Sequence, residues 1–214
     1  MNSAVIVAGG SGVRLGEKIP KQFIKINGKE ILAYSVETFY NHKLINEVII
    51  VSHPSWFDIV TKKYKYCKVV KGGKRRQDSS LNGILKTNDN TKNILIHDAA
   101  RPFITSKIIT KCIEELNYFD GIAPAVNISS SIIKYINNKA SYIDRKQILE
   151  VQTPQCFKKN IIFEALSSNI EATDEIGMVL RKLPKAKLNF IDGDINNKKI
   201  TSKLDLNYFK IIKN

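Results

Sequence analysis

Short apolar runs rich in β-branched residues recur along the first half of the chain, each followed by glycine, proline or polar residues. They lie at 4–7, 48–51, 68–70 and 94–97, and runs of this length and composition predict buried strands. The stretches that separate and follow them carry apolar residues at helical spacing, at 31–40, 56–64, 79–85 and 108–116. Strands that alternate with helices predict an α/β fold built on a mostly parallel, doubly wound sheet.

The alternation changes after Pro124. Two strand-like runs, 128–136 and 140–144, flank the turn residues Asn137-Asn138 and predict a β-hairpin. The pattern then predicts a strand at 150–153, helices at 158–167 and 174–182 with Thr173 as the N-cap of the second, and a last central strand at 188–191. Since no repeat or linker is visible, we expect a single domain over residues 1–214 with a β-arm at about 128–144.

The composition is that of a folded soluble protein, which excludes a disordered or fibrous chain. Of the 214 residues, 43% are hydrophobic and 25% are charged. No apolar run approaches the ~18 residues of a membrane span, and the first residues lack the basic region of a secretory signal. The three cysteines have no CxxC spacing, which predicts reduced thiols without a disulfide or a zinc site. We therefore expect a cytoplasmic protein without a membrane partner.

The net charge of +14 arises from 34 Lys and Arg against 20 Asp and Glu. Such an excess is typical of proteins that bind nucleic acid, a membrane surface or a phosphorylated small molecule. The lysines are spread along the whole chain, without a basic block of five and without aromatic residues interleaved with arginine. This favours solvated surface charge, so a nucleic-acid-binding module is only a distant alternative.

Residues that could bind phosphate follow the predicted strands, at the end where open parallel sheets bind their ligands. Gly9-Gly10-Ser11-Gly12 comes after the first strand, and glycines allow backbone N–H groups to approach a phosphate closely. Arg14 adds a guanidinium fork and Lys21 a point charge. The spacing matches neither the P-loop nor the dinucleotide fingerprint, and a glycine turn can also be purely structural.

Two further segments follow predicted strands. Gly72-Gly73 leads to Ser79 near the start of a helix, where free N–H groups favour anions. Asp98, at the next strand end, is a candidate metal or hydroxyl ligand, and Arg101 would neutralise it or hold a second anion. His97, inside the apolar strand, is interpreted as a structural core residue.

Motifs of several other catalytic classes are missing from the sequence. It contains no nucleophile elbow, no HExxH and no cysteine in an electropositive motif. A cationic, glycine-lined site with one strand-end acid favours phosphoryl or nucleotidyl transfer, in which positioning and charge stabilisation do most of the catalysis.

Seven motifs can be read in order along the chain. They are Ala8-Gly9-Gly10-Ser11-Gly12-Val13-Arg14, Pro20-Lys21-Gln22, Gly72-Gly73 with Arg76 and Ser79, His97-Asp98-Ala99-Ala100-Arg101-Pro102, Asp144-Arg145, Gln152-Thr153-Pro154-Gln155 and Thr173-Asp174-Glu175. Together they resemble the 2-C-methyl-D-erythritol 4-phosphate cytidylyltransferase family of the non-mevalonate isoprenoid pathway, over about residues 4–206. The resemblance implies a Rossmann-like nucleotidyltransferase fold whose β-arm crosses to a partner and makes a homodimer. It also implies transfer of CMP from CTP to 2-C-methyl-D-erythritol 4-phosphate, with Mg²⁺ held mainly through the CTP phosphates.

The same resemblance implies roles for single residues. Four would be catalytic, the first two at the CTP phosphates and the last two at the acceptor phosphate: Arg14, Lys21, Arg145 and Lys199. The nucleotide would contact Ala8, Gly9, Gly10, Ser11, Gly12, Gly72, Ser79, Asp98 and Ala99. The acceptor would contact Asp98, Arg101, Ser131, Arg145, Thr153 and Lys199, with Arg145 acting from the arm of the other subunit. No dedicated protein metal site is implied.

Two departures from the family pattern concern the acceptor. Ser129-Ser130-Ser131 stands where the family usually has Asp-Thr, and Ser131 best matches the threonine hydroxyl. Lys198 stands beside Lys199 where an apolar residue is usual, so Lys199 is chosen by register alone. A pentitol-phosphate cytidylyltransferase, with an acceptor such as ribitol 5-phosphate, shares nearly all the nucleotide motifs and is the alternative within the enzyme class.

Overall fold

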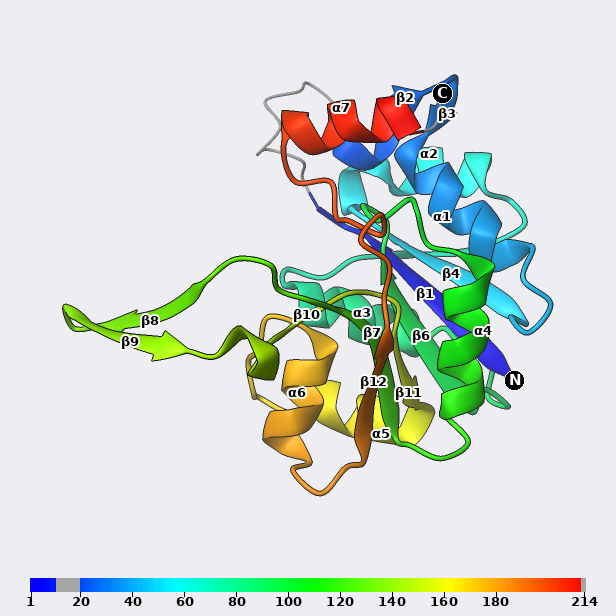
Figure 1. Cartoon of the computed structure of the whole chain (residues 1–214). Helices are drawn as coiled ribbons and strands as arrows, with labels where there is room; N and C mark the ends of the chain where they lie inside the picture. Colours follow the sequence, from blue (N-terminus) through cyan, green and yellow to red (C-terminus); the bar gives the residue numbers. More distant parts are fainter. Residues whose placement is uncertain (11–19, 213–214) are drawn as a thin grey trace.

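A single mixed sheet organises the protein (Figure 1). The computed structural model describes residues 1–10 and 20–212. Within this part of the chain the strand order is β10-β7-β11-β6-β1-β4-β5, and β12 pairs with β7. The strands of this sheet are β1 (Asn2–Ala8), β4 (Glu47–Ser52), β5 (Lys68–Lys71), β6 (Asn93–Asp98), β7 (Gly121–Asn127), β10 (Leu149–Val151), β11 (Gln155–Lys158) and β12 (Leu188–Asp192).

The strand order reverses at β1, which is parallel to both β4 and β6. The chain moves outward from β1 to β4 and β5, then returns to form β6 on the other side of β1. Beyond β6 the sheet is mixed, because β11 runs antiparallel to both β6 and β7. The carboxyl ends of β1 and β6 therefore meet at a switch in strand order, where open α/β sheets bind ligands.

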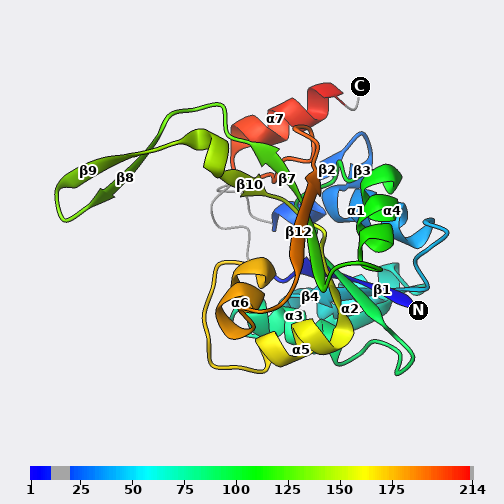
Figure 2. The ribbon, with the colours of Figure 1, turned by 60° about the horizontal axis from the view of Figure 1, so that its bottom comes forward.

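Helices cover both faces of the sheet (Figure 2). One layer contains α1 (Ile31–Tyr40), α2 (Phe57–Lys63) and α4 (Ser106–Glu115), and the other contains α3 (Arg76–Ile84), α5 (Lys159–Leu166) and α6 (Glu175–Lys182). Because side chains alternate along a strand, Ile6 of β1 packs in the first layer's core and Val5 in the second. Helix α3 approaches the sheet closely at Gly83, where a Cβ atom would lie 2.4 Å from Val5 Cγ1.

A smaller core lies at the edge of the main body. The short hairpin of β2 (Lys25–Ile26) and β3 (Lys29–Glu30) packs with α1 and the C-terminal helix α7 (Lys203–Ile212). This core consists of Ile26, Ile31, Ile200, Leu206 and Phe209. Figure 1 shows α7 at the same end of the molecule as β2 and β3. The packing therefore ties the end of the chain to the segment that follows Pro20.

The predicted arm is a two-stranded ribbon of β8 (Ile132–Ile136) and β9 (Lys139–Ile143) that projects from the body (Figure 1). Asn137 and Asn138 form its turn with φ values of 50° and 61°, a left-handed conformation that asparagine tolerates. The aromatic rings on the ribbon are uncovered, with Tyr135 66% and Tyr142 72% exposed. The hairpin prediction is confirmed within a few residues.

Several sequence predictions need correction. The strand at 188–191 is not central, because β12 pairs only with β7 in the described residues. The strand predicted at 150–153 ends at Val151, where the chain turns through a cis Thr153–Pro154 bond into β11. The N-cap of α6 is Asp174 rather than Thr173, because the Asp174 carboxylate accepts the Gly177 N–H at 2.9 Å. None of the described helices is long and apolar enough to cross a membrane.

Candidate active site

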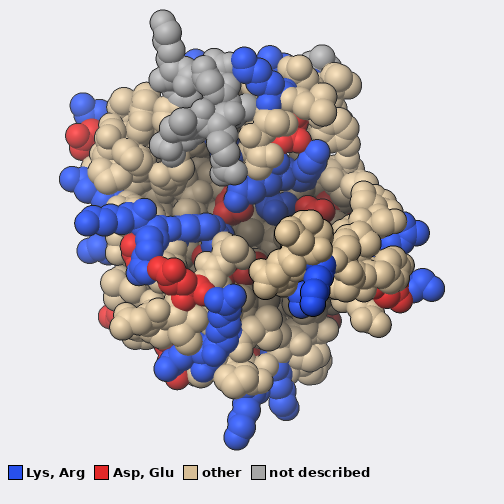
Figure 3. Space-filling view, turned by 90° about the vertical axis from the view of Figure 1, so that its left-hand side faces the viewer, with Lys and Arg blue, Asp and Glu red and all other residues tan. Residues whose placement is uncertain are grey.

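A cavity of about 850 Å³ opens at the strand-order switch, between the carboxyl ends of β1, β5 and β6. Figure 3 shows a face that is hollowed near its centre, with Lys and Arg side chains bordering the hollow. The sequence-predicted residues that line the cavity are Ala8, Gly9, Gly10, Lys21, Gly72, Ser79, Asp98, Ala99 and Lys199. Of the other predicted residues, Ser11, Gly12 and Arg14 lie outside the described part of the chain.

The glycine turn after β1 is held by a side chain that the sequence analysis did not assign. Gln22 is 2% exposed, and its Nε2 donates to the carbonyl oxygens of Ala8 at 2.8 Å and Gly10 at 2.9 Å. With both carbonyls occupied by one amide, the end of β1 is fixed beside the cavity. The Pro20-Lys21-Gln22 motif was the one sequence feature that could have pointed to this role of Gln22.

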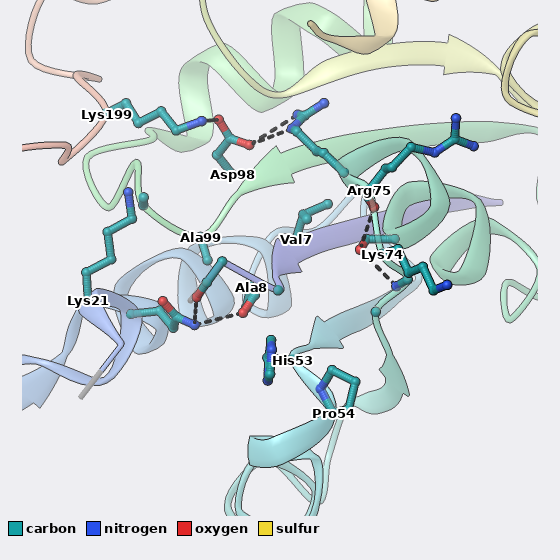
Figure 4. Close-up of a pocket in the computed structure, with 18 of the residues that line it drawn as sticks. Val7, Ala8, Lys21, His53, Pro54, Lys74, Arg75, Asp98, Ala99 and Lys199 are labelled. Atoms are coloured by element: carbon teal, nitrogen blue, oxygen red, sulfur yellow. Dashed lines mark hydrogen bonds and ion pairs between the residues drawn. The ribbon is translucent and has the colours of Figure 1, made fainter. Parts of the chain in front are cut away.

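Lys21 and Lys199 bring two cations to the cavity from segments far apart in sequence. Lys21 Nζ donates to the Ile200 carbonyl at 2.7 Å, which ties the β1–α1 connection to the segment after β12. Lys199 Nζ lies 2.7 Å from Asp98 Oδ2. Figure 4 shows both lysines on the side of the cavity opposite Lys74 and Arg75. The small core around Phe209 holds this arrangement in place.

The second glycine segment packs against the start of α3. The Ser79 hydroxyl accepts the Gly73 N–H at 3.1 Å and donates to the Arg75 carbonyl at 3.2 Å. A Cβ at Gly72 would lie 3.0 Å from Ser79 Oγ, so only glycine allows this close approach without a shift. Gly72, Gly73 and Ser79 together form a cavity wall of backbone and hydroxyl groups.

Asp98 is the acidic centre of the site. Its Oδ1 accepts from Arg76 Nη2 at 3.1 Å, its Oδ2 from Lys199, and Arg101 Nε lies 3.9 Å away. Burial alone would raise the pKa of Asp98, but the neighbouring Arg76 and Lys199 charges outweigh it and hold that pKa below its usual range. Asp98 therefore faces the cavity as a carboxylate surrounded by cations.

Behind Asp98, a hydrogen-bonded chain fixes the end of β6. His97 is fully buried, with Nε2 3.0 Å from the Arg101 carbonyl and Nδ1 3.0 Å from Thr153 Oγ1. Thr153 Oγ1 in turn accepts the Asp98 N–H at 3.1 Å. All of these bonds are satisfied if His97 is neutral with its proton on Nε2. The structural interpretation of His97 is confirmed, and the hydroxyl of Thr153 faces β6.

Four predicted acceptor-binding residues do not line the cavity of this chain: Arg101, Ser131, Arg145 and Thr153. Arg101 is 8% exposed, and its Nη1 donates to the Asn197 carbonyl at 2.8 Å, just behind Asp98. Ser131 and Arg145 belong to the exposed arm, where Arg145 Nη1 donates to the Ser129 carbonyl. The structure therefore separates the arm residues from the cavity of their own chain.

The sequence analysis quoted Arg76 only as part of a motif and gave Glu175 no role. The Arg76 guanidinium connects the two carboxylates, with Asp98 on one edge and Glu175 Oε2 at 2.5 Å on another. Burial of Arg76 would lower its pKa, but Glu175 and Asp98 outweigh burial and the pKa is raised. Arg76 and Glu175 are 99 positions apart, so no local sequence pattern indicates that they are in contact.

Comparison with known proteins assigns the chain to a family. The sequence model for 2-C-methyl-D-erythritol 4-phosphate cytidylyltransferase matches residues 2–213. The chain belongs to this family. It is therefore a nucleotidyltransferase of the cytidylyltransferase type, as the order of its motifs predicted.

Relatives match nearly the whole chain. The 2-C-methyl-D-erythritol 4-phosphate cytidylyltransferase of Clostridium botulinum (strain ATCC 19397 / Type A) is 39% identical, over 96% of this chain and 94% of that protein. The enzyme of the same name from Thermotoga neapolitana is 35% identical, over 99% and 96%. A bifunctional ribulose 5-phosphate reductase/CDP-ribitol pyrophosphorylase of Haemophilus influenzae is also 35% identical, but this chain covers only 46% of it.

Solved structures confirm the Rossmann-like nucleotidyltransferase fold. The 4-diphosphocytidyl-2C-methyl-D-erythritol synthase of Anaerococcus prevotii superposes with a TM-score of 0.88, at 24% identity and over 100% of this chain and 96% of that one. Another structure of 4-diphosphocytidyl-2C-methyl-D-erythritol synthase gives a TM-score of 0.82 at 27% identity, over 100% and 99%.

Proposed function

We propose that this cavity carries out the reaction of its family. In that reaction a phosphate oxygen of 2-C-methyl-D-erythritol 4-phosphate attacks the α-phosphorus of CTP. A new P–O bond forms, the bond between the α-phosphorus and the bridging oxygen to the β-phosphate breaks, and pyrophosphate leaves. The observation that carries the proposal is that glycine-lined backbone, Lys21 and Lys199 converge on one cavity at the strand-order switch of a cytidylyltransferase-family fold.

On the nucleotide side, the turn after β1 and the Gly72–Ser79 wall bind CTP. Backbone N–H groups of Ala8, Gly9 and Gly10 cradle the phosphates, and Gly72 and Ser79 contact the cytosine or ribose. The family resemblance adds Ser11 and Gly12, which lie outside the described residues. Lys21, together with Arg14 outside the described residues, stabilises the charge that develops on the α-phosphate and the departing pyrophosphate. Asp98 and Ala99 line the junction between nucleotide and acceptor.

On the acceptor side, Lys199 binds the phosphate of the sugar alcohol beside the end of β6, and Arg101 and Thr153 support that end from behind. The nucleophile needs no general base, because a phosphate monoester with a second pKa of about 6 is already a dianion near neutral pH. Arg145 and Ser131 reach the acceptor from a second subunit, whose arm crosses to this cavity in a homodimer. Exposed Tyr135 and Tyr142 on the arm support that pairing, since an uncovered apolar ribbon is an association surface.

The residues present fit Mg²⁺ as a companion of the nucleotide. Asp98 is the acid among the described cavity-lining residues, and the described chain contains no group of three or more His, Cys, Asp or Glu side chains able to hold a metal. Mg²⁺ commonly binds through one or two carboxylates plus substrate phosphates. Asp98 could add one oxygen to a metal held mainly by CTP, and the metal would neutralise phosphate charge. The cytoplasmic location expected from the sequence stays a prediction.

Pyrophosphate release tests the proposal directly. We expect release from CTP with 2-C-methyl-D-erythritol 4-phosphate and much slower release with ribitol 5-phosphate. Lys21→Ala should lower kcat at least ~100-fold, the scale for loss of a preorganised charge-stabilising donor. The same loss is expected for Arg14→Ala from the family resemblance.

Lys25→Ala is the matched control, because Lys25 is an exposed lysine of β2 close to Lys21 in sequence and absent from the cavity lining. Its kcat should equal that of the wild type. Near-wild-type turnover in folded Lys21→Ala would contradict the proposed role. Faster release with ribitol 5-phosphate would instead favour the pentitol-phosphate alternative.

A further inference from the structure

The Thr173-Asp174-Glu175 motif has no role in the reaction as described above, yet it carries the most deeply buried acid near the site. Glu175 is 1% exposed, and its carboxylate accepts from Arg76 Nη1 at 2.5 Å and from Ser80 Oγ at 2.6 Å. A buried carboxylate is costly unless its oxygens are paired in this way. The contacts join the start of α6 to the start of α3, immediately behind the cavity.

The Arg76 guanidinium uses its different edges for two acids. Its Nε and Nη2 donate to Asp98 Oδ1 at 3.3 and 3.1 Å, while Nη1 donates to Glu175. In Figure 4 the dashed lines on one side of Asp98 mark the guanidinium bonds, and Lys199 approaches from the other side. A planar fork held at both edges cannot rotate without breaking an ion pair.

Glu175 is not needed to anchor its own helix. The Asp174 carboxylate caps α6 at Gly177 N, and Gln155 Oε1 accepts the Ile176 N–H at 2.9 Å. Gln155 Nε2 also donates to Asp174 at 2.8 Å. These bonds fix the first turn of α6 independently, which leaves the Glu175 carboxylate to orient Arg76.

We propose that Glu175 is a positioning residue for cytidylyl transfer, which acts through Arg76 to hold the Asp98 carboxylate and, with it, Lys199. The inference rests on the proposed function. Without the Glu175 carboxylate, the Arg76 guanidinium is held at one edge only and can rotate away from Asp98. Asp98 Oδ1 then loses its partner, and Lys199 loses the fixed acid that aims it at the acceptor.

A double-mutant cycle on kcat tests this chain of contacts. Glu175→Gln keeps the size of the side chain and an oxygen that can accept from Ser80, but removes the charge that holds Arg76. We expect kcat to fall about 10- to 100-fold, because small displacements of reacting groups cost that much. The KM for CTP should stay nearly unchanged. Arg76→Lys should give a similar loss, because an ammonium cannot bridge both acids in the same geometry.

Non-additivity separates positioning from general destabilisation. In an Asp98→Asn background, Glu175→Gln should lower kcat by less than about twofold, because the group it positions is already gone. Ser80→Ala, a milder change, should show a smaller loss with the same background dependence. Asp120→Asn is the control, since Asp120 pairs with Lys158 outside the cavity and should leave kcat unchanged.

Losses of kcat that are fully additive with Asp98→Asn, or a wild-type kcat in folded Glu175→Gln, would overturn the inference. If Glu175→Gln does not fold, the same criteria apply to Ser80→Ala. Failure of the wild-type protein to release pyrophosphate from CTP and the acceptor would refute the proposed function instead.

Discussion

Two adjacent lysines near the C-terminus have different surroundings, and their chemistry follows from those surroundings. Lys199 points into the cavity and pairs with Asp98, whereas Lys198 is 58% exposed and pairs with Asp205 at 2.8 Å. We expect Lys199→Ala to raise the KM for the acceptor phosphate about 10-fold or more, since charge-assisted hydrogen bonds contribute about 1.5–3 kcal/mol. The kcat should also fall, because the attacking oxygen is no longer aligned. Steady-state kinetics with each substrate varied in turn measures both effects.

Lys198→Ala is the control on the neighbouring residue. Asp205 keeps its hydrogen bonds from Thr201 and Ser202 when Lys198 is lost, and Lys198 lies outside the cavity, so both KM values should stay unchanged. If Lys198→Ala lost most of its activity and Lys199→Ala kept wild-type kinetics, the register at this motif would be wrong by one residue. If Lys199→Ala raised the KM for CTP and left the KM for the acceptor unchanged, the division of the cavity between the two substrates would be contradicted.

His97 makes the stability of the fold depend on pH. Burial lowers the pKa of His97 from 6.5 to about 4. Between these two values the unfolded chain binds a proton that the native protein does not, so the free energy of unfolding falls as the pH decreases from 6.5 to 4. The loss is at most roughly 3 kcal/mol, from 1.36 kcal/mol per pKa unit. Urea unfolding at pH 7 and pH 4.5 measures this loss of free energy of unfolding. In His97→Gln the free energy of unfolding should differ less between the two pH values. An equal difference in both proteins would contradict this assignment.

At the scale of elements, the sequence pattern predicted those helices and strands whose bounds depend on local hydrophobic spacing. Helix α1 spans Ile31–Tyr40 as its apolar spacing predicted, and the parallel strands β1, β4 and β6 lie within two residues of their predicted bounds. Strand β7 was missed because Pro124 lies in its middle and a proline argues against a strand. In the folded protein Pro124 lies opposite Ile191 of β12, and its carbonyl accepts the Gln152 N–H. Helix α7, whose buried face packs on the distant Ile26 and Ile31, was also missed.

The site divides in the same way. Glycines, Lys21 and Asp98 could be predicted because the ends of parallel strands converge on one edge of the sheet. The roles of Gln22 and Glu175 could not, since each depends on a contact that only the folded chain creates. Lys199 was chosen by family register, and its approach to Asp98 depends on the small core that holds α7. The roles that the sequence did not predict depend on contacts between residues far apart in the chain, and not on the residue types themselves.

At the scale of the whole molecule, the arm poses a geometric question. Arg145 and Ser131, expected at the acceptor, do not line the cavity of their own chain, and the ribbon of β8 and β9 extends away from the body (Figure 1). Projecting apolar ribbons are aggregation-prone unless they pair. A two-fold dimer that exchanges arms would cover the ribbon and deliver Arg145 to the partner's cavity. Each active site would then need residues from two chains.

Mixing two inactive variants tests this sharing. Arg145→Ala and Lys21→Ala each remove one group, and each homodimer should have two defective sites. If Arg145 acts across the interface, a mixed dimer contains one site with both defects and one site with none. Random exchange of equal amounts makes half of the dimers mixed, so about a quarter of wild-type activity should return. The double variant Arg145→Ala/Lys21→Ala, mixed with wild type in the same way, controls for exchange. No recovery despite mixed dimers detected by differential tags would mean that Arg145 acts within its own chain or not at all.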